Sequence, residues 1–236
     1  MSELFDEIGT PIQKAEIFEQ YRAALLRENK TVNLTAITDP EEVEIKHFID
    51  SLLLLRSAQW KQSAGGSKQM LRVADVGSGA GFPGVPLAIV CENVQLDCLE
   101  ASRKRSVFIL RLAKELKLHR MRAVHIRAEE AGRNPQYRES YEWVVSRAVA
   151  PMPVLLEYCL PLVKIGGCFA AYKGAAESGE EDDAIAQRMG GRLADVLHAT
   201  LPMGKGERQI RLFKKLAHTP AQYPRRPGIP AKTPLA

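Results

Sequence analysis

From residue 71 onward, short apolar segments alternate with segments of helical periodicity, and this alternation constrains the fold more than any other feature of the sequence. We expect strands at 71–77, 94–100, 121–127, 142–149 and 168–173. Helices are expected after the acidic segment 177–183 and at 83–91, 102–118 and 151–163. This alternation predicts an α/β fold with a mainly parallel sheet covered on both faces. The last two of seven strands, with no helix between them, predict an antiparallel hairpin at the sheet edge: residues 195–201 and 208–215.

The two ends of the chain follow different patterns. Residues 10–29 have apolar side chains at helical spacing, and a second helix is expected from Asp39, a good capping residue, to Arg56. Residues 61–70 indicate a loop. Five of the 14 prolines lie after residue 217, which excludes a helix or a central strand there. The chain therefore divides into an N-terminal helical extension, a main domain and a Pro-rich basic tail: residues 1–65, 66–217 and 218–236.

The segment after the first expected strand is rich in glycine and opens a helix, as nucleotide-binding loops do. Gly79-x-Gly81-x-x-Gly84 fits the dinucleotide fingerprint, whereas Asp75-x-Gly77-x-Gly79-x-Gly81 fits the first motif of S-adenosylmethionine-dependent methyltransferases. An acid inside a strand is costly to bury without a function. This cost and the terminal hairpin favour the methyltransferase interpretation, with Asp75 near the methionine end of the cofactor.

Two further acids end strands on the same side of the expected sheet. Glu100 ends the second strand, where a carboxylate can accept hydrogen bonds from ribose hydroxyls, a need that both cofactors share. Ala128-Glu129 ends the third strand, at the position that usually contacts adenine in methyltransferases. A solvent-facing strand end and a helix cap are the structural alternatives for these two places.

The fourth strand ends in Ser146-Arg147-Ala148 and offers no acid, no cysteine and no Pro-Pro pair. The signatures of exocyclic-amine and carbon-5 pyrimidine methylation are therefore absent. A ring nitrogen such as guanine N7 carries a free lone pair and needs no general base or metal, so alignment and electrostatics suffice. Arg147 suits recognition of phosphate or guanine, and a structural ion pair is its alternative role.

The net charge of +5 is unevenly distributed. Residues 101–127 hold nine Lys/Arg and one acid, and residues 201–236 hold eight Lys/Arg and one acid, so the rest of the chain is acidic. Two basic segments on an acidic protein suggest a polyanionic partner, although solvated helix and strand faces would give the same counts.

Several other classes are excluded by composition. The apolar run 52–55 is far too short for a bilayer, and the first ten residues carry acids without an apolar signal region. The four cysteines form no C-x-x-C pair, so we expect buried thiols and no metal site. These features predict a cytoplasmic protein that does not contact a membrane.

Several segments occur together in one order, and as a set they are highly specific: Asn33-Leu34-Thr35, Lys46-His47-Phe48-Ile49-Asp50-Ser51-Leu52, 75–84, Lys104-Arg105-x-x-Phe108, Ser146-Arg147-Ala148, Tyr172-Lys173-Gly174 and the tail from Pro224 to Leu235. The chain resembles, over almost its whole length, the bacterial small-subunit ribosomal RNA guanine-N7 methyltransferase family, also called glucose-inhibited division protein B. The resemblance implies a Rossmann-like class I methyltransferase fold, S-adenosylmethionine as methyl donor and one guanine of 16S rRNA as acceptor.

The resemblance also assigns residues. It implies Arg147 as the catalytic residue where cofactor and guanine meet. Together with the loop reading it implies these cofactor contacts: Asp75, Gly77, Gly79, Phe82, Glu100, Ala101, Ser102, Ala128, Glu129 and Arg147. The RNA contacts it implies are Lys173, Arg225 and Arg226. We expect a monomer that acts on 16S rRNA or on the small ribosomal subunit.

Some alternatives stay open at this point. An NAD(P)-dependent oxidoreductase would need a proton-relay pair such as Tyr-x-x-x-Lys, which we do not find, and a non-catalytic RNA-binding protein would not need an intact glycine loop. A small-molecule methyltransferase would leave the basic segments without a purpose. His47 is expected to be packed and hydrogen-bonded, and Asn33-Leu34-Thr35 either closes over the cofactor or caps a turn.

Overall fold

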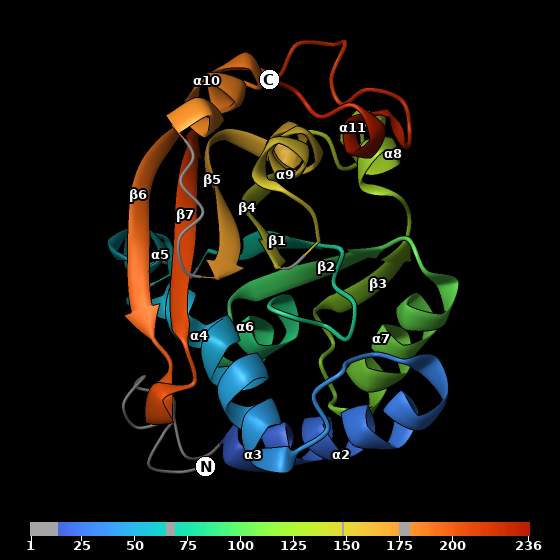
Figure 1. The fold of residues 1–236 in the computed structure, drawn as a ribbon. Helices are drawn as coiled ribbons and strands as arrows, with labels where there is room; N and C mark the ends of the chain where they lie inside the picture. The colour runs from blue at the N-terminus through green and yellow to red at the C-terminus, as the bar shows by residue number, and fades with distance from the viewer. Residues whose placement is uncertain (1–13, 65–68, 148, 175–179) are drawn as a thin grey trace.

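A seven-stranded sheet forms the centre of the computed structural model, which describes residues 14–64, 69–147, 149–174 and 180–236 (Figure 1). The strands are β1 (Leu71–Val76), β2 (Val94–Glu100), β3 (Met121–His125), β4 (Tyr141–Arg147), β5 (Val163–Gly174), β6 (Gly191–Thr200) and β7 (Glu207–Lys215). Their order is β3-β2-β1-β4-β5-β7-β6, and the first five are mutually parallel. β7 runs antiparallel to both β5 and β6, so the predicted mainly parallel sheet with an antiparallel last strand is confirmed.

Helices cover both faces of the sheet. One face carries α6 (Gly84–Val90) and α7 (Arg103–Glu115), and the other carries α8 (Ala128–Arg133), α9 (Met152–Cys159) and α10 (Glu180–Arg188). Successive side chains of β1 point to opposite faces of the sheet, so Val73 packs into one apolar cluster and Ala74 into the other. In the described part of the chain, no helix is long and apolar enough to cross a membrane.

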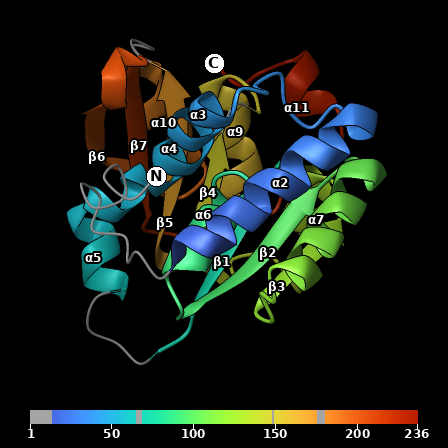
Figure 2. The same ribbon diagram turned by 90° about the horizontal axis from the view of Figure 1, so that it is seen from below.

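The N-terminal extension packs onto the α6 face. It consists of α2 (Ala15–Val32), α3 (Pro40–Val43), the π-helix η2 (Glu44–Ile49), α4 (Asp50–Leu52), the 3₁₀ turn η3 (Leu53–Arg56) and α5 (Ala58–Ala64). Figure 2 shows α2 running alongside α7. The Asp39 side chain caps α3 by accepting from the Glu42 amide at 2.9 Å, as predicted. Residues 1–13, where the first helix was predicted to begin, lie outside the described residues.

Two predictions at the edges of the main domain were wrong. The expected loop at 61–70 begins as helix α5, because Trp60 is buried against Trp143, with 5.0 Å between ring centroids, and anchors that helix. Residues 65–68 of that loop lie outside the described residues. The prolines of the tail do not exclude a helix either. Ile229–Lys232 form the single turn α11, in which Pro230 occupies a first-turn position that needs no amide hydrogen.

The four cysteines are free thiols, and three of them are buried: Cys98, Cys159 and Cys168. Burial raises the pKa of each of these thiols above the ordinary value. Such thiols act as small apolar side chains in the two clusters, as their apolar sequence surroundings predicted. Among the described residues, no group of three or more His, Cys, Asp or Glu side chains is placed to hold a metal ion.

Candidate functional site

Two hollows lie at the carboxyl edge of the parallel sheet, one where β1 and β2 end and the other where β4 and β5 end. The first, here called the strand-end hollow, has a volume of about 280 Å³ and is lined by Val76, Gly77, Leu99, Glu100, Ala101, Arg105, Ile126, Arg127, Ala128, Glu129, Val149 and Tyr158. The second, the basic hollow, has a volume of about 490 Å³ and is lined by Ile37, Lys46, His47, Asp50, Arg147, Tyr172, Lys173, Gly174 and Arg208. Ligands of open α/β sheets bind at this edge.

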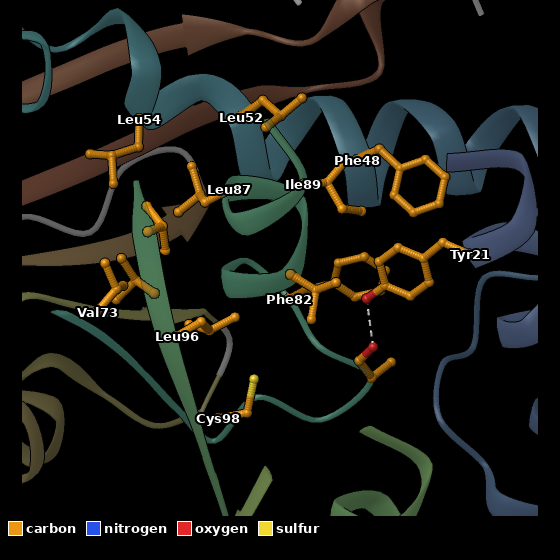
Figure 3. Packing of buried hydrophobic residues seen from close by; sticks show 14 of the residues in the cluster. Tyr21, Phe48, Leu52, Leu54, Val73, Phe82, Leu87, Ile89, Leu96 and Cys98 are labelled. Carbon is orange, nitrogen blue, oxygen red and sulfur yellow. Dashed lines mark hydrogen bonds between the residues drawn. The ribbon is translucent and has the colours of Figure 1, made fainter. Parts of the chain in front are cut away.

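The glycine loop after β1 bends into a conformation that other residues do not tolerate. Gly77 and Gly81 have φ angles of +70° and +102°. A Cβ at Gly77 would lie 2.5 Å from Val149 Cγ2, and a Cβ at Gly81 would lie 2.6 Å from the Tyr21 hydroxyl. That hydroxyl donates a 2.6 Å hydrogen bond to the Ala80 carbonyl, the dashed line in Figure 3. The loop is thus shaped by its glycines and fastened by α2.

Asp75 connects β1 to the start of α6. Its side chain is fully buried, and Oδ2 accepts a 2.9 Å hydrogen bond from the Gly84 amide. Burial raises the pKa of Asp75 to about 7. Oδ1 has no hydrogen-bond partner among the described residues. The strand acid that the sequence singled out is therefore half satisfied by the fold, and its second oxygen can accept from a donor.

Glu100 connects the end of β2 to the glycine loop. Its buried carboxylate accepts from the Gly79 amide at 2.9 Å and from the Ser102 amide at 2.7 Å. Each oxygen keeps a further lone pair for a ligand. Glu100 and Ala101 line the strand-end hollow, whereas Ser102 contributes its amide at the start of α7. The structure thus brings Gly77, Glu100 and Ala101 together, as predicted.

Ala128 and Glu129 form the first turn of α8 and line the same hollow. The prediction that these two residues end the third strand was wrong, because β3 ends at His125 and they begin a helix whose cap is Arg127. Glu129 is 3% exposed, and its Oε1 accepts a 2.9 Å hydrogen bond from the Gly228 amide of the tail. Tyr158 lines the same hollow, and burial, followed by the negative charge of Glu129, raises the pKa of Tyr158 to about 12.

Arg147 at the end of β4 lies in the basic hollow and is held by the N-terminal extension. Nη1 donates to Asp50 Oδ2 at 2.8 Å and to the Lys46 carbonyl at 3.1 Å, and Nη2 lies 3.1 Å from His47 Nδ1. The guanidinium also lies 5.0 Å from the centre of the Phe82 ring. The ion pair that the sequence left open is therefore present. Of five N–H groups, the Nε–H and one Nη2–H have no partner among the described residues.

His47 is packed and hydrogen-bonded, as expected. Because a guanidinium only donates, Nδ1 accepts from Arg147, so the proton lies on Nε2 and is donated to Thr35 Oγ1 at 2.8 Å. Burial, followed by the Arg147 charge, lowers the pKa of His47 to about 3, so the ring is neutral at pH 7. Phe82 stacks between His47 and Tyr21 and lines neither hollow, so this predicted cofactor residue shapes the loop from its buried side.

The expected RNA contacts lie in different places. Lys173 lines the basic hollow, and its Nζ donates to the Ala150 carbonyl at 2.9 Å. Arg225 lies in the tail, where Nε and Nη2 donate to the fully buried Glu157 at 2.9 and 2.7 Å. Arg226 is exposed. Of the motif Ser146-Arg147-Ala148, the structure describes Ser146 and Arg147, and Ala148 lies outside the described residues.

Sequence reasoning missed part of both hollows. Asp50 and Lys46 lie in a segment that was noticed only as part of a motif, although a π-helix there places their groups around Arg147. Arg208 donates from Nε to Asp50 Oδ1 at 3.1 Å and reaches the basic hollow from β7. Nothing in the sequence singles out Tyr158, since an aromatic residue in an apolar helix is the common case.

The family model and the sequence relatives similar to this chain carry one name. A family model described as rRNA small subunit methyltransferase G matches residues 14–208. The protein named ribosomal RNA small subunit methyltransferase G from Pelotomaculum thermopropionicum is 41% identical over 97% of this chain and 95% of its own length. The protein of the same name from Desulfitobacterium hafniense is 44% identical over 96% of this chain and 90% of its own length.

Solved structures with low sequence identity share the fold. The [4+2]-cyclase SpnF is similar with a TM-score of 0.53 and 13% identity, over 72% of this chain and 82% of its own. TYW2 from Pyrococcus horikoshii, solved in complex with MeSAdo, is similar with a TM-score of 0.50 and 16% identity, over 64% of this chain and 60% of its own. These likenesses confirm the predicted Rossmann-like fold and no more, since one of the two is a cyclase.

Proposed function

Because the chain belongs to the rRNA small subunit methyltransferase G family, we propose that it transfers a methyl group from S-adenosylmethionine to N7 of a guanine in 16S rRNA. One observation carries this proposal. Arg147 and Val149, two residues apart at the end of β4, line different hollows. A donor in one hollow and an acceptor in the other would meet at this strand end, which is the proximity that methyl transfer requires.

The residues of the strand-end hollow fit the cofactor. S-adenosylmethionine supplies a methyl group on a positively charged sulfur, which a nucleophile can remove directly. Glu100 keeps lone pairs for the ribose hydroxyls, and the first turn of α8 at Ala128 and Glu129 forms a wall for the adenine. Asp75 is buried and lines neither hollow, so its place at the methionine end stays a prediction, in which its unpaired Oδ1 would accept from the ammonium group. Gly77, whose φ of +70° favours glycine, leaves its part of the lining without a side chain.

The basic hollow suits the nucleotide that accepts the methyl group. Lys46, Lys173 and Arg208 surround Arg147, and Asp50 is the only carboxylate among the described lining residues. This excess of cations attracts phosphates. The unpaired Nε–H and Nη2–H of Arg147 can donate to guanine O6, which leaves the N7 lone pair free to attack. Because N7 has no proton to remove, positioning of the two reactants and electrostatic stabilisation are sufficient for the reaction, and no general base is needed.

The alternatives fit less well. A dinucleotide-dependent oxidoreductase is disfavoured by the family match and by the antiparallel β7. A non-catalytic RNA-binding protein does not need an intact glycine loop bonded to Glu100. In the proposal the chain works as a cytoplasmic monomer on 16S rRNA, free or within the small subunit, and Lys173 and Arg226 contact RNA.

The test is transfer of tritiated methyl groups to unmodified 16S rRNA, with N7-methylguanosine identified by mass spectrometry. We expect label in one guanine of the wild-type reaction and none with Arg147→Ala. Arg147→Lys keeps the charge without the planar fork and should recover little activity. Circular dichroism and adenosylhomocysteine binding report whether each variant is folded. Absence of label from a wild-type protein that binds the cofactor would overturn the proposal, and an active Arg147→Ala would reject the role of Arg147.

A further inference from the structure

The C-terminal tail is fastened to the wall of the strand-end hollow, beyond the residues 14–208 that the family model covers. Arg225 makes the strongest attachment, since its backbone amide, Nε and Nη2 all donate to Glu157 at 2.7 to 2.9 Å. Glu157 lies on α9 and is fully buried. A bidentate arginine on a buried carboxylate is a strong and directional contact.

A second set of contacts holds the tail to α8. Arg138 donates to the carbonyls of Thr219 and Tyr223 at 2.6 and 2.9 Å. Gly132 of α8 faces Pro224 so closely that a Cβ at this glycine would lie 2.8 Å from the proline ring. In Figure 1, α11 lies beside α8. The tail therefore rests on α8 and α9, two of the helices whose residues line the hollow.

One contact leads from the tail into the hollow. The Gly228 amide donates to Glu129 Oε1 at 2.9 Å. The Glu129 carboxylate and the Tyr158 phenol both line the strand-end hollow. Gly228 has a φ angle of +83°, a conformation that glycine adopts at little cost and that presents its amide to the carboxylate. A buried carboxylate deprived of this donor would have to reorient or attract water.

We propose that Gly228 and Arg225 are positioning residues for the cofactor: the docked tail orients Glu129 in the wall of the hollow, and thereby sets the affinity of the hollow for the adenosine part of S-adenosylmethionine. This inference rests on the proposed function for the identity of the ligand. It reassigns Arg225 from RNA contact to tail anchor. Because coupling between two binding events is reciprocal, bound cofactor also stabilises the docked tail.

The first experiment compares three tail variants by calorimetric titration with adenosylhomocysteine. Arg225→Gln should weaken binding by about tenfold, within the usual range of coupling between sites. Arg225→Lys keeps one contact to Glu157 and should recover part of the affinity. Lys232→Gln removes a charge from an exposed position of α11 and should bind like wild type. Steady-state kinetics should show a raised KM for S-adenosylmethionine, with kcat and the KM for RNA unchanged.

The second experiment needs no variant. Hydrogen exchange of the Gly228 amide in the wild-type protein should slow when adenosylhomocysteine is bound. Equal affinity of a folded Arg225→Gln, or exchange at Gly228 that the ligand does not change, would overturn the inference. A rise in the RNA KM alone would return Arg225 to the RNA interface and equally overturn it. Since both readouts are ligand binding, a wild-type protein that binds the ligand without methylating rRNA would reject the proposed function and leave this inference standing.

Discussion

The N-terminal extension and the C-terminal tail both pack beside the hollows, but they do so by different means. The extension buries large aromatic side chains: Tyr21 and Phe48 have no exposed surface and pack against Phe82 of the glycine loop. The tail contributes few apolar groups and is attached by arginines on Glu157 and on backbone carbonyls. Apolar burial supplies most of the stability of a fold, whereas directional hydrogen bonds set local geometry.

The two regions also support different hollows. The extension surrounds Arg147 through Lys46, His47 and Asp50, so it builds the basic hollow. The tail reaches Glu129 and so supports the strand-end hollow. We infer that changes in the extension affect methyl transfer and folding, and that changes in the tail affect cofactor affinity.

The largest effect is expected where the extension meets the glycine loop. Gly81→Val places its Cβ 2.6 Å from the Tyr21 hydroxyl and 2.7 Å from Val85, at a φ of +102°. Strain and overpacking together should cost about 2–4 kcal/mol of unfolding free energy, and cofactor binding should be lost. Denaturant unfolding and calorimetry measure both. Gly166→Ala is the control, since Gly166 has a similar φ of +83° with no atom within 4 Å, and it should lose about 1 kcal/mol. Equal losses of unfolding free energy in the two variants would show that the clash at Gly81 adds nothing to the backbone strain.

A smaller effect is expected from Asp50→Asn. Asp50 accepts from both Arg147 and Arg208, so an amide removes the charge that orients the two guanidinium groups. Methyl transfer should slow by roughly 10–100-fold, which corresponds to about 1.4–2.8 kcal/mol. Adenosylhomocysteine affinity should stay unchanged. A large loss of that affinity would show that the extension also builds the strand-end hollow, and the division of roles would be wrong.

Local patterns in the sequence predicted the parts of the site that are contiguous in the chain. β2 was predicted to its last residue, Glu100, because its apolar run ends in an acid before a helix. The glycine loop was found for the same reason. The partners of Arg147 could not be found, since Asp50 is almost a hundred residues earlier and one of many acids that could pair with an arginine. Such pairings depend on packing between elements.

The count of charged residues also could not predict which cations are exposed. The last basic segment has eight cations, yet the fold uses several of them internally. Lys215 is fully buried among the carbonyls of Leu160 and Met189, and Arg211 pairs with the buried Asp182. Arg225 pairs with Glu157. Counting charges along a chain therefore overstates the charge that a surface offers to RNA, because it cannot tell an exposed cation from a buried anchor.

A third prediction concerns acid stability. The pKa of His47 is lowered to about 3 in the folded protein, against 6.5 for an ordinary histidine. Between these values the unfolded chain binds more protons, so stability is fully present above pH 6.5 and is lost as pH falls toward 3. The slope from this group should reach about 1.4 kcal/mol per pH unit. His47→Gln should flatten the acid limb of thermal unfolding, and His119→Gln, at an exposed side chain, is the control for the loss of a histidine. If the stability of wild type and of His47→Gln fell in parallel as the pH is lowered, His47 would not be the group that causes the acid dependence.

The smallest effect is expected from Tyr21→Phe, which removes one hydroxyl and keeps the ring stacked on Phe82. The lost hydrogen bond to the buried Ala80 carbonyl should cost about 1 kcal/mol of unfolding free energy. Because Ala80 belongs to the glycine loop, we expect this contact of the extension to affect the cofactor side as well. Adenosylhomocysteine affinity should fall by a few-fold at most, less than in Arg225→Gln. Tyr21→Phe could instead lower the affinity for adenosylhomocysteine more than Arg225→Gln does. In that case the glycine loop and the extension that holds it would control cofactor affinity, and the tail would have only a structural role.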